Sequence, residues 1–229
     1  MKAIAVLILS LAFAASPLLV DGFAGFEPSQ FPVVVEEPPV QPAGWAFAIW
    51  GPIYAWLIVS AAYGVLFRRD DAGWDAARPP LIVSLGVGAV WIPVANASPV
   101  WASVLIWAML GGAVWALLRA PRRDRMWFAW PVGLYAGWLT AASCVSLGIL
   151  AMGYGLPPFG PVGWSVLFLV VALGIAGAVL WRRAVWTYAA AVAWALVGVV
   201  AANGFGIVAT LAGFGAVGVA SMAVRMFRA

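Results

Sequence analysis

Long apolar runs separated by short polar segments divide this chain. Each run has about the length that a helix needs to cross a bilayer, roughly 20 residues. The run "SVLFLVVALGIAGAVLW" at 165–181 does not alternate between apolar and polar positions, as a transmembrane β-strand would. The pattern therefore predicts an all-α integral membrane protein, a bundle of about eight transmembrane helices. The predicted helices are 3–20, 43–67, 80–97, 99–118, 126–152, 162–181, 185–202 and 205–224.

One predicted boundary lies inside an uncharged run. Residues 81–118 carry no charge and are too many for a single span of about 20 residues. Within this run, Ser98 can cap a helix and Pro99 can occupy its first turn, so "NASP" at 96–99 predicts a tight hairpin. The dipeptide "NG" at 203–204 is a turn signal between the last two helices.

The basic residues test this division into helices. All 12 Lys and Arg fall at alternate boundaries between the predicted helices, and the intervening loops contain none. They are Lys2, Arg68, Arg69, Arg78, Arg119, Arg122, Arg123, Arg125, Arg182, Arg183, Arg225 and Arg228. The first intervening loop instead carries Asp21, Glu27, Glu36 and Glu37. By the positive-inside rule, this alternation places both termini in the cytoplasm.

The first apolar segment has two interpretations. "MKAIAVLILSLAFAASPLLV" has one lysine, an apolar run and an A-x-A at 12–14, as a cleaved signal peptide would. Its apolar stretch is long for a signal peptide, and no polar region follows the A-x-A directly, which favours a retained helix. Cleavage would leave one span fewer and would move the N-terminus outside.

Composition excludes several classes of function. With 66% hydrophobic and 9% charged residues, the chain lacks the polar surface of a soluble domain, and its net charge of +4 reflects the basic loops rather than nucleic-acid binding. There is no histidine, and a single cysteine, Cys144, excludes an intramolecular disulfide and a thiolate metal cluster. No Asp, Glu, Lys or Arg lies inside a predicted helix, which argues against a proton-coupled transporter or an intramembrane enzyme. The adjacent Glu36 and Glu37 are more often solvated than bound to a metal.

The 15 tryptophans form two groups. Those at helix edges or in a loop are typical interface anchors, and these are Trp45, Trp74, Trp101, Trp127, Trp164, Trp181 and Trp186. The deeper ones are Trp50, Trp56, Trp91, Trp107, Trp115, Trp130, Trp138 and Trp194. Because a deep indole N–H needs a partner that lipid tails do not offer, some of these rings are expected to face the protein interior or a pocket.

Helical spacing brings some deep side chains together. Phe47, Trp50 and Tyr54 share one face of the second helix. The other candidates of this kind are Trp91, Asn96, Tyr135 and Trp138. Aromatic rings with a few hydroxyl and amide groups describe a pocket for a flat or largely apolar ligand, but tight helix packing explains the same pattern equally well. The G-x-x-x-G at Gly133 and Gly137 predicts close packing of the fifth helix against another helix.

Three segments of the chain resemble a known family. "PAGWAFAIWGPIYAW" at 42–56 resembles the stretch P-P-G-W-x-F-x-x-x-W-x-x-x-Y, which opens the second helix of the TspO/MBR family. These are the tryptophan-rich sensory proteins and the related translocator proteins, and the form here is similar to a longer bacterial branch. "PVGLYAGWLTAASCVSL" at 131–147 resembles the fifth-helix segment of that branch, and "YAAAVAWALVGV" at 188–199 is a weaker match near the end.

The resemblance implies an organisation and a function. It implies a five-helix core at residues 1–152 and a three-helix extension at 153–229. Because members of the family are often dimeric, a homodimer is one expected form. The expected protein is a non-enzymatic sensor or carrier in a bacterial inner membrane, with no required cofactor. Its expected ligand is a tetrapyrrole such as porphyrin or haem, or a sterol-like molecule, bound in a tryptophan-lined pocket near the first loop. The candidate ligand-binding residues are Trp45, Phe47, Trp50, Tyr54, Trp91, Asn96, Tyr135 and Trp138.

Two positions depart from the family pattern. The third helix of the family has an Asn three residues before its Trp, where this chain has Gly88 before Trp91, and a late fifth-helix Asn falls at Ser146. These changes bear on the identity of the ligand more than on the fold. Without histidine, a tetrapyrrole would be held by stacking and shape. The alternative function is a structural or regulatory subunit whose aromatic faces pack against other membrane proteins.

Overall fold

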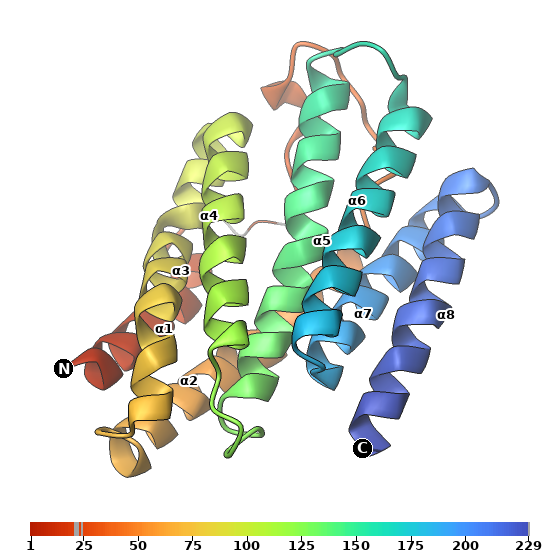
Figure 1. Ribbon diagram of the computed structural model, residues 1–229. Coiled ribbons are helices and arrows are strands. Elements are labelled where there is room, and N and C mark those ends of the chain that lie inside the picture. The colour runs from red at the N-terminus through yellow and green to blue at the C-terminus, as the bar shows by residue number, and fades with distance from the viewer. Residues whose placement is uncertain (21–22, 24, 229) are drawn as a thin grey trace.

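The chain folds as a bundle of long helices. In the computed structural model, residues 1–20, 23 and 25–228 are described, and within them there are eight helices long and apolar enough to cross a membrane, with no strand (Figure 1). They are α1 (Lys2–Leu19), α2 (Trp50–Phe67), α3 (Ala72–Ala97), α4 (Pro99–Leu118), α5 (Ala129–Gly153), α6 (Pro161–Arg182), α7 (Trp186–Asn203) and α8 (Ile207–Arg228). Short 3₁₀ turns precede α2, at Pro28–Gln30 and Gly44–Ile49. The all-α prediction is confirmed.

The local signals for helix ends act as the sequence predicts. Between α3 and α4, the Ser98 side chain accepts a hydrogen bond from the backbone N–H of Trp101 at 3.4 Å, and Pro99 is the first residue of α4. The hairpin within the long uncharged run is therefore confirmed. After α7, Gly204 has a φ of 60°, which a glycine adopts without the steric cost of a side chain.

Helix α5 is the centre of the bundle. Figure 1 shows α1, α3 and α4 on one side of it and α6, α7 and α8 on the other. Helix α5 contacts α2, α4, α6 and α7, whereas α8 packs mainly on α7. In its most apolar window 72% of α5 is buried within the protein, against 28% for α1 and for α6. The residues of α5 are therefore placed to line an internal site.

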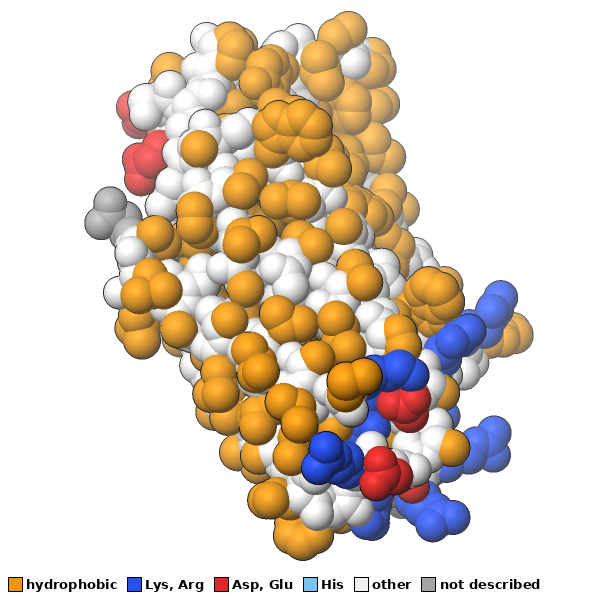
Figure 2. All heavy atoms as spheres, turned by 90° about the vertical axis from the view of Figure 1, so that its left-hand side faces the viewer, with side chains coloured by type: hydrophobic (Ala, Val, Ile, Leu, Met, Phe, Trp, Pro, Cys, Tyr) orange, Lys and Arg blue, Asp and Glu red, His pale blue; other side chains and the backbone are white. Residues whose placement is uncertain are grey.

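Charged side chains gather at the two ends of the bundle. Figure 2 shows Lys and Arg at one end, and a broad band of hydrophobic side chains extends from there over this face. We call this the basic end; the opposite end, with Glu27, Glu36 and Glu37, is the acidic end. Asp21, predicted in the same acidic loop, lies outside the described residues. A bundle with an apolar girdle between polar ends matches a bilayer, so this is an integral membrane protein.

Helix α3 begins at Ala72 and not at residue 80, as the sequence predicted. The side chain of Asp71 caps it by accepting a hydrogen bond from the backbone N–H of Trp74 at 3.0 Å. The prediction that Trp74 is a loop anchor is also wrong, because this ring is buried. Its indole Nε1 donates to Asp124 Oδ2 at 3.2 Å, and its ring packs edge-on against Phe128.

The longer α3 contains charged residues, so the expectation of helices without ionisable groups is wrong for this span. Arg78 is buried within α3, close to Asp75. Its guanidinium donates to the backbone oxygens of Gly64 at 3.3 Å, Arg68 at 2.7 Å and Arg69 at 2.8 Å, where α2 ends. A cation at a helix C-terminus meets carbonyl groups that have no intrahelical partner, which offsets the cost of its burial.

Helices α5 and α7 approach each other closely at glycines. A Cβ at Gly133 would lie 2.7 Å from Thr187 Oγ1, and a Cβ at Gly137 would overlap the backbone oxygen of Tyr188 and lie 2.9 Å from Ala191 Cβ. The Thr187 hydroxyl donates to the backbone oxygen of Trp130 at 2.7 Å, so a hydrogen bond supports the same contact. The predicted packing role of this glycine pair is confirmed.

We predict that Gly137→Ala destabilises the protein by about 1–3 kcal/mol, the usual cost of overpacking a tight contact. A matched control is Gly111→Ala on α4, because a Cβ there meets nothing within 4 Å. Thermal unfolding in detergent measures both variants. Equal melting temperatures for the two variants would contradict the close contact of α5 with α7.

Candidate functional site

The site begins where the chain enters α2. The 3₁₀ turn at Gly44–Ile49 leads directly into Trp50, and this turn places Phe47 beside Trp50. The rings of Phe47 and Trp50 both meet Trp138 of α5 edge-on, at centroid distances of 5.6 Å and 6.1 Å. Trp50 also stacks on Tyr54 at 5.3 Å. The shared face predicted for α2 therefore points at α5.

Phe13 of α1 is the hub of this aromatic cluster. Its ring packs edge-on against Trp50, Tyr54 and Tyr135 at centroid distances of 5.6, 5.0 and 5.7 Å. The ring fits because α3 has a glycine at this level: a Cβ at Gly88 would lie 2.9 Å from Phe13 Cε2. At the position where the family has an asparagine, this chain therefore packs a phenyl ring from α1.

A polar link fixes the base of the cluster. The Ser84 hydroxyl donates to the backbone oxygen of Met109 at 2.7 Å and lies 3.0 Å from the Tyr135 hydroxyl. Since the single Ser84 proton is used on the carbonyl, Tyr135 donates to Ser84. Tyr135 is fully buried, so its ring and hydroxyl support the cluster from beneath.

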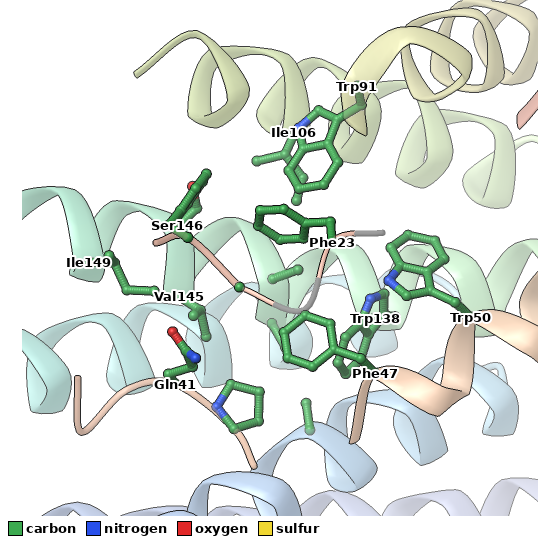
Figure 3. A pocket seen from close by; sticks show the side chains of 16 residues that line it. Phe23, Gln41, Phe47, Trp50, Trp91, Ile106, Trp138, Val145, Ser146 and Ile149 are labelled. Carbon is green, nitrogen blue, oxygen red and sulfur yellow. The ribbon is translucent and has the colours of Figure 1, made fainter. Parts of the chain in front are cut away.

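Above this base lies a cavity, here called the inner pocket (Figure 3). Four predicted residues line it, and these are Phe47, Trp50, Trp91 and Trp138. Sequence reasoning missed most of the others, which include Phe23, Phe26, Gln41, Ile106, Val145 and Ile149. The space that the centre of a water molecule can reach is about 50 Å³. The walls are almost wholly apolar, so the pocket suits a hydrophobic ligand.

The few polar groups of the inner pocket differ in how they are paired. Trp91 Nε1 donates to the backbone oxygen of Ala102 at 2.8 Å, so Trp91 presents only its ring. Ser146 lines the pocket where the family has an asparagine, and its hydroxyl is hydrogen-bonded to Ser103. Trp138 is buried, and its Nε1–H has no hydrogen-bond partner among the described residues. In Figure 3 the indole nitrogens of Trp138 and Trp50 lie where the two rings meet.

A wider vestibule adjoins the inner pocket at the acidic end. The two cavities share Gly25, Phe26, Gln41 and Ile149 as lining residues, so they are adjacent and these residues lie between them. The vestibule offers about 670 Å³ to the centre of a water molecule. Other residues that line it include Glu27, Gln30, Glu36 and Asn96. The vestibule therefore lies under the first loop, beside two exposed carboxylates and a neutral amide.

Helix α7 holds the segment that leads into the site. Trp194 Nε1 donates to the backbone oxygen of Ala46 at 2.8 Å, and Asn203 Nδ2 donates to the backbone oxygen of Pro39, also at 2.8 Å. Ala195 of α7 lines the inner pocket itself. Helix α7 of the C-terminal part thus helps to shape the site, while the boundary at residue 152 stays a prediction.

The remaining predicted residues lie around the pocket rather than in its lining. Trp45 is 47% exposed and packs edge-on against Trp194, which fits its second predicted role as an interface anchor. Tyr54 and Tyr135 belong to the cluster around Phe13. Asn96 borders the vestibule. Among the described residues, no group of three or more Asp, Glu or Cys side chains is arranged to hold a metal ion.

We predict that Gly88→Ala destabilises the protein by about 1–3 kcal/mol because the new methyl group collides with Phe13. In a Phe13→Leu background the same substitution should cost less, since the ring is gone. A double-mutant cycle of thermal unfolding gives the coupling, expected to be at least about 0.5 kcal/mol for residues in contact. A coupling of zero would mean that Phe13 does not occupy this space.

Comparison with known proteins agrees with this architecture. A family model described as TSPO-like protein matches residues 32–225, from the first loop into the last turns of α8. Searches of curated proteins and of solved structures returned no similar chain. The match includes the entrance to α2, the whole of α5 and the helices that follow it. The chain belongs to the family of TSPO-like proteins.

Proposed function

We propose that this protein binds a flat, largely apolar molecule of the tetrapyrrole class, such as porphyrin or haem, and acts as a membrane sensor or carrier for it. The observation that carries the proposal is the buried N–H of Trp138, which has no hydrogen-bond partner among the described residues, on a ring that lines an almost wholly apolar pocket. A buried donor without a partner costs about 1–3 kcal/mol, which a ligand with an acceptor atom recovers.

The aromatic walls supply the rest of the proposed affinity. Phe47, Trp50 and Trp91 come from two helices and the turn before one of them, and present ring faces and edges to the same space. A conjugated macrocycle gains both from removal of its apolar surface from water and from ring contacts of about 0.5–1.5 kcal/mol each. With no histidine in the sequence, haem would be held by these contacts and not by an imidazole on its iron.

The size of the cavity determines how such a ligand sits. About 50 Å³ of reachable space holds a few water molecules at most, far less than a macrocycle needs. A tetrapyrrole therefore occupies the inner pocket and the vestibule together and displaces Phe26 and Gln41, which line both. A smaller ligand, such as a sterol-like molecule, would demand the same opening because it too exceeds the inner pocket.

The charge distribution supports the orientation that completes this proposal. The basic end faces the cytoplasm by the positive-inside rule, with both termini on that side, and the vestibule opens on the other side of a bacterial inner membrane. Ligand thus enters from outside and reaches a site embedded in the bundle. The proposed activity is binding and transfer, with no chemical step.

We predict that protoporphyrin quenches the tryptophan fluorescence of the detergent-solubilised protein saturably. Trp138→Phe keeps an aromatic ring, though a smaller one, and removes the N–H; it should weaken binding by about tenfold, the upper range for one neutral hydrogen bond. Trp50→Leu removes an aromatic ring from the pocket lining and should weaken porphyrin binding further. Trp181→Phe is the control, because this α6 ring is 87% exposed and remote from the pocket residues.

Unsaturable quenching would defeat the proposal. So would an affinity that stays unchanged in both folded pocket variants.

We predict that a porphyrin dimethyl ester binds more tightly than the free diacid. Glu27 and Glu36 border the vestibule, and their carboxylates repel the ligand's propionates. A preference of about threefold is expected at about 0.01 M salt, and it should decline as salt screens the charges. Glu36→Gln should reduce the preference more than Glu37→Gln, since only Glu36 of this adjacent pair lines the vestibule. A preference for the diacid would show that the propionates lie elsewhere.

A further inference from the structure

A second cavity lies at the basic end, further towards that end of α5 and α7 than the proposed ligand pocket. It is formed by the loop between α4 and α5, the loop between α6 and α7, and the end of α8. Its main lining residues are Arg122, Arg125, Trp130, Arg182, Arg183 and Trp186, and none of its lining residues is acidic. The space open to the centre of a water molecule is about 330 Å³. We call it the arginine cavity.

One arginine fastens the two loops together. Arg183 Nη2 donates to the backbone oxygen of Ala120 at 2.9 Å and to that of Pro121 at 3.2 Å, just beyond the end of α4. Burial, together with the charges of Arg122 and Arg125, lowers the pKa of the Arg183 guanidinium from its ordinary value. Arg183 therefore holds the two loops together although the positive charges of Arg122 and Arg125 repel it.

The nearest acidic residue of the same loop does not neutralise these arginines. Asp124 has a φ of 57°, and its carboxylate accepts hydrogen bonds from Arg68 Nε at 2.6 Å and from Trp74 Nε1 at 3.2 Å. The hydrogen bond from Arg68 is the main reason why the pKa of Asp124 is lowered, so this carboxylate stays charged and committed to α2 and α3. The excess positive charge of the arginine cavity remains for an external anion.

The backbone adds to the positive potential. Ala129, the first residue of α5, and Trp186, the first residue of α7, both line the arginine cavity. Neither helix has a side-chain cap at its N-terminus. The positive ends of two helix dipoles therefore meet at the four arginines, and this combination favours a phosphate group.

We propose that the arginine cavity binds a phosphate-bearing anion, namely the headgroup of an anionic phospholipid. Trp130 and Trp186 lie in the first turns of α5 and α7, between the arginines and the apolar part of the bundle, and pack edge-on at a centroid distance of 5.5 Å. With Met226 of α8 they form an apolar wall beside the charged one. A molecule with phosphate at one end and acyl chains at the other matches both walls, and basic pockets between transmembrane helices recognise such headgroups.

The bound headgroup has a structural consequence. The lining arginines come from two different loops, and α8 closes the third side, so one phosphate would bridge all three elements. An anionic lipid should therefore both bind and raise the melting temperature.

The test compares phosphatidylglycerol with phosphatidylcholine on the full-length protein in detergent. Native mass spectrometry should show retained phosphatidylglycerol at a concentration where phosphatidylcholine is lost. The double variant Arg122→Gln/Arg182→Gln removes two exposed arginines that line the cavity, and it should weaken phosphatidylglycerol binding by about thirtyfold, from about fivefold for each arginine. The matched control Arg69→Gln/Arg123→Gln removes two exposed arginines at the same end that do not line it.

The outcomes separate the sources of the phosphate. Loss of phosphatidylglycerol binding in the cavity variant but not in the control supports the lipid site. If instead inorganic phosphate stabilises the wild type but not the cavity variant, and lipid binding shows no preference, the anion site stands but its occupant is a soluble phosphate. Equal losses in both double variants, or no response to either anion, overturn the site. Melting temperatures in phosphatidylcholine, expected to match the wild type, confirm that both variants are folded.

Discussion

At Gly137 the backbone of α5 meets the carbonyl oxygen of Tyr188 on α7, and no side chain fits between them. The contact is reinforced one turn along α5, where the Tyr188 hydroxyl lies 2.7 Å from that of Thr140. Because α7 is held this close, its residues can reach the segment that enters α2 and hold it by two hydrogen bonds. Trp138, the next residue after Gly137, then meets the rings of that segment. The position of α7, and with it the hold on the segment that leads into the pocket, thus depends on this close approach of the two backbones.

Some buried polar groups of the interior are hydrogen-bonded and others are not. Hydroxyl groups pair across helices, as Ser84 does with Tyr135 and Ser103 with Ser146, which removes the cost of burying them. Trp138 Nε1 has no such partner among the described residues. Ser10 and Trp107 have unpaired groups in the same sense, but neither lines the inner pocket. Of these three residues, Trp138 is therefore the one that combines an unpaired group with a place in the lining of the inner pocket.

Local signals in the sequence predict much of this fold, and tertiary contacts explain the rest. Ser98 and Pro99 mark a hairpin because capping acts within a few residues. The start of α3 was misplaced because the burial of Arg78 depends on carbonyl groups at the end of another helix. From the hydropathy pattern alone, Arg78 marks the end of a loop. The backbone oxygens that accept its hydrogen bonds lie at the end of another helix and are not adjacent to it in sequence.

In the candidate site, too, local sequence patterns predict some residues and tertiary contacts determine the others. Helical spacing found Phe47 and Trp50, because residues three apart share a face. It could not find Phe23 or Phe26, since a loop has no period that gives its side chains a direction. Phe13 is one apolar residue among many in α1, and only the space above Gly88 distinguishes it.

The central position of Phe13 has a consequence for the order of assembly. Its partners are synthesised at widely separated times: Trp50 and Tyr54 follow soon after, but Tyr135 arrives later, and Ala195 closes the pocket last. At about 5–20 residues per second, the ribosome needs roughly 10–40 s to pass from Phe13 to Ala195. During that interval the aromatic faces of α1 and α2 lie in the bilayer without α5 or α7. The newborn protein therefore passes through a stage in which lipid, or another membrane protein, covers the surfaces that later enclose the pocket.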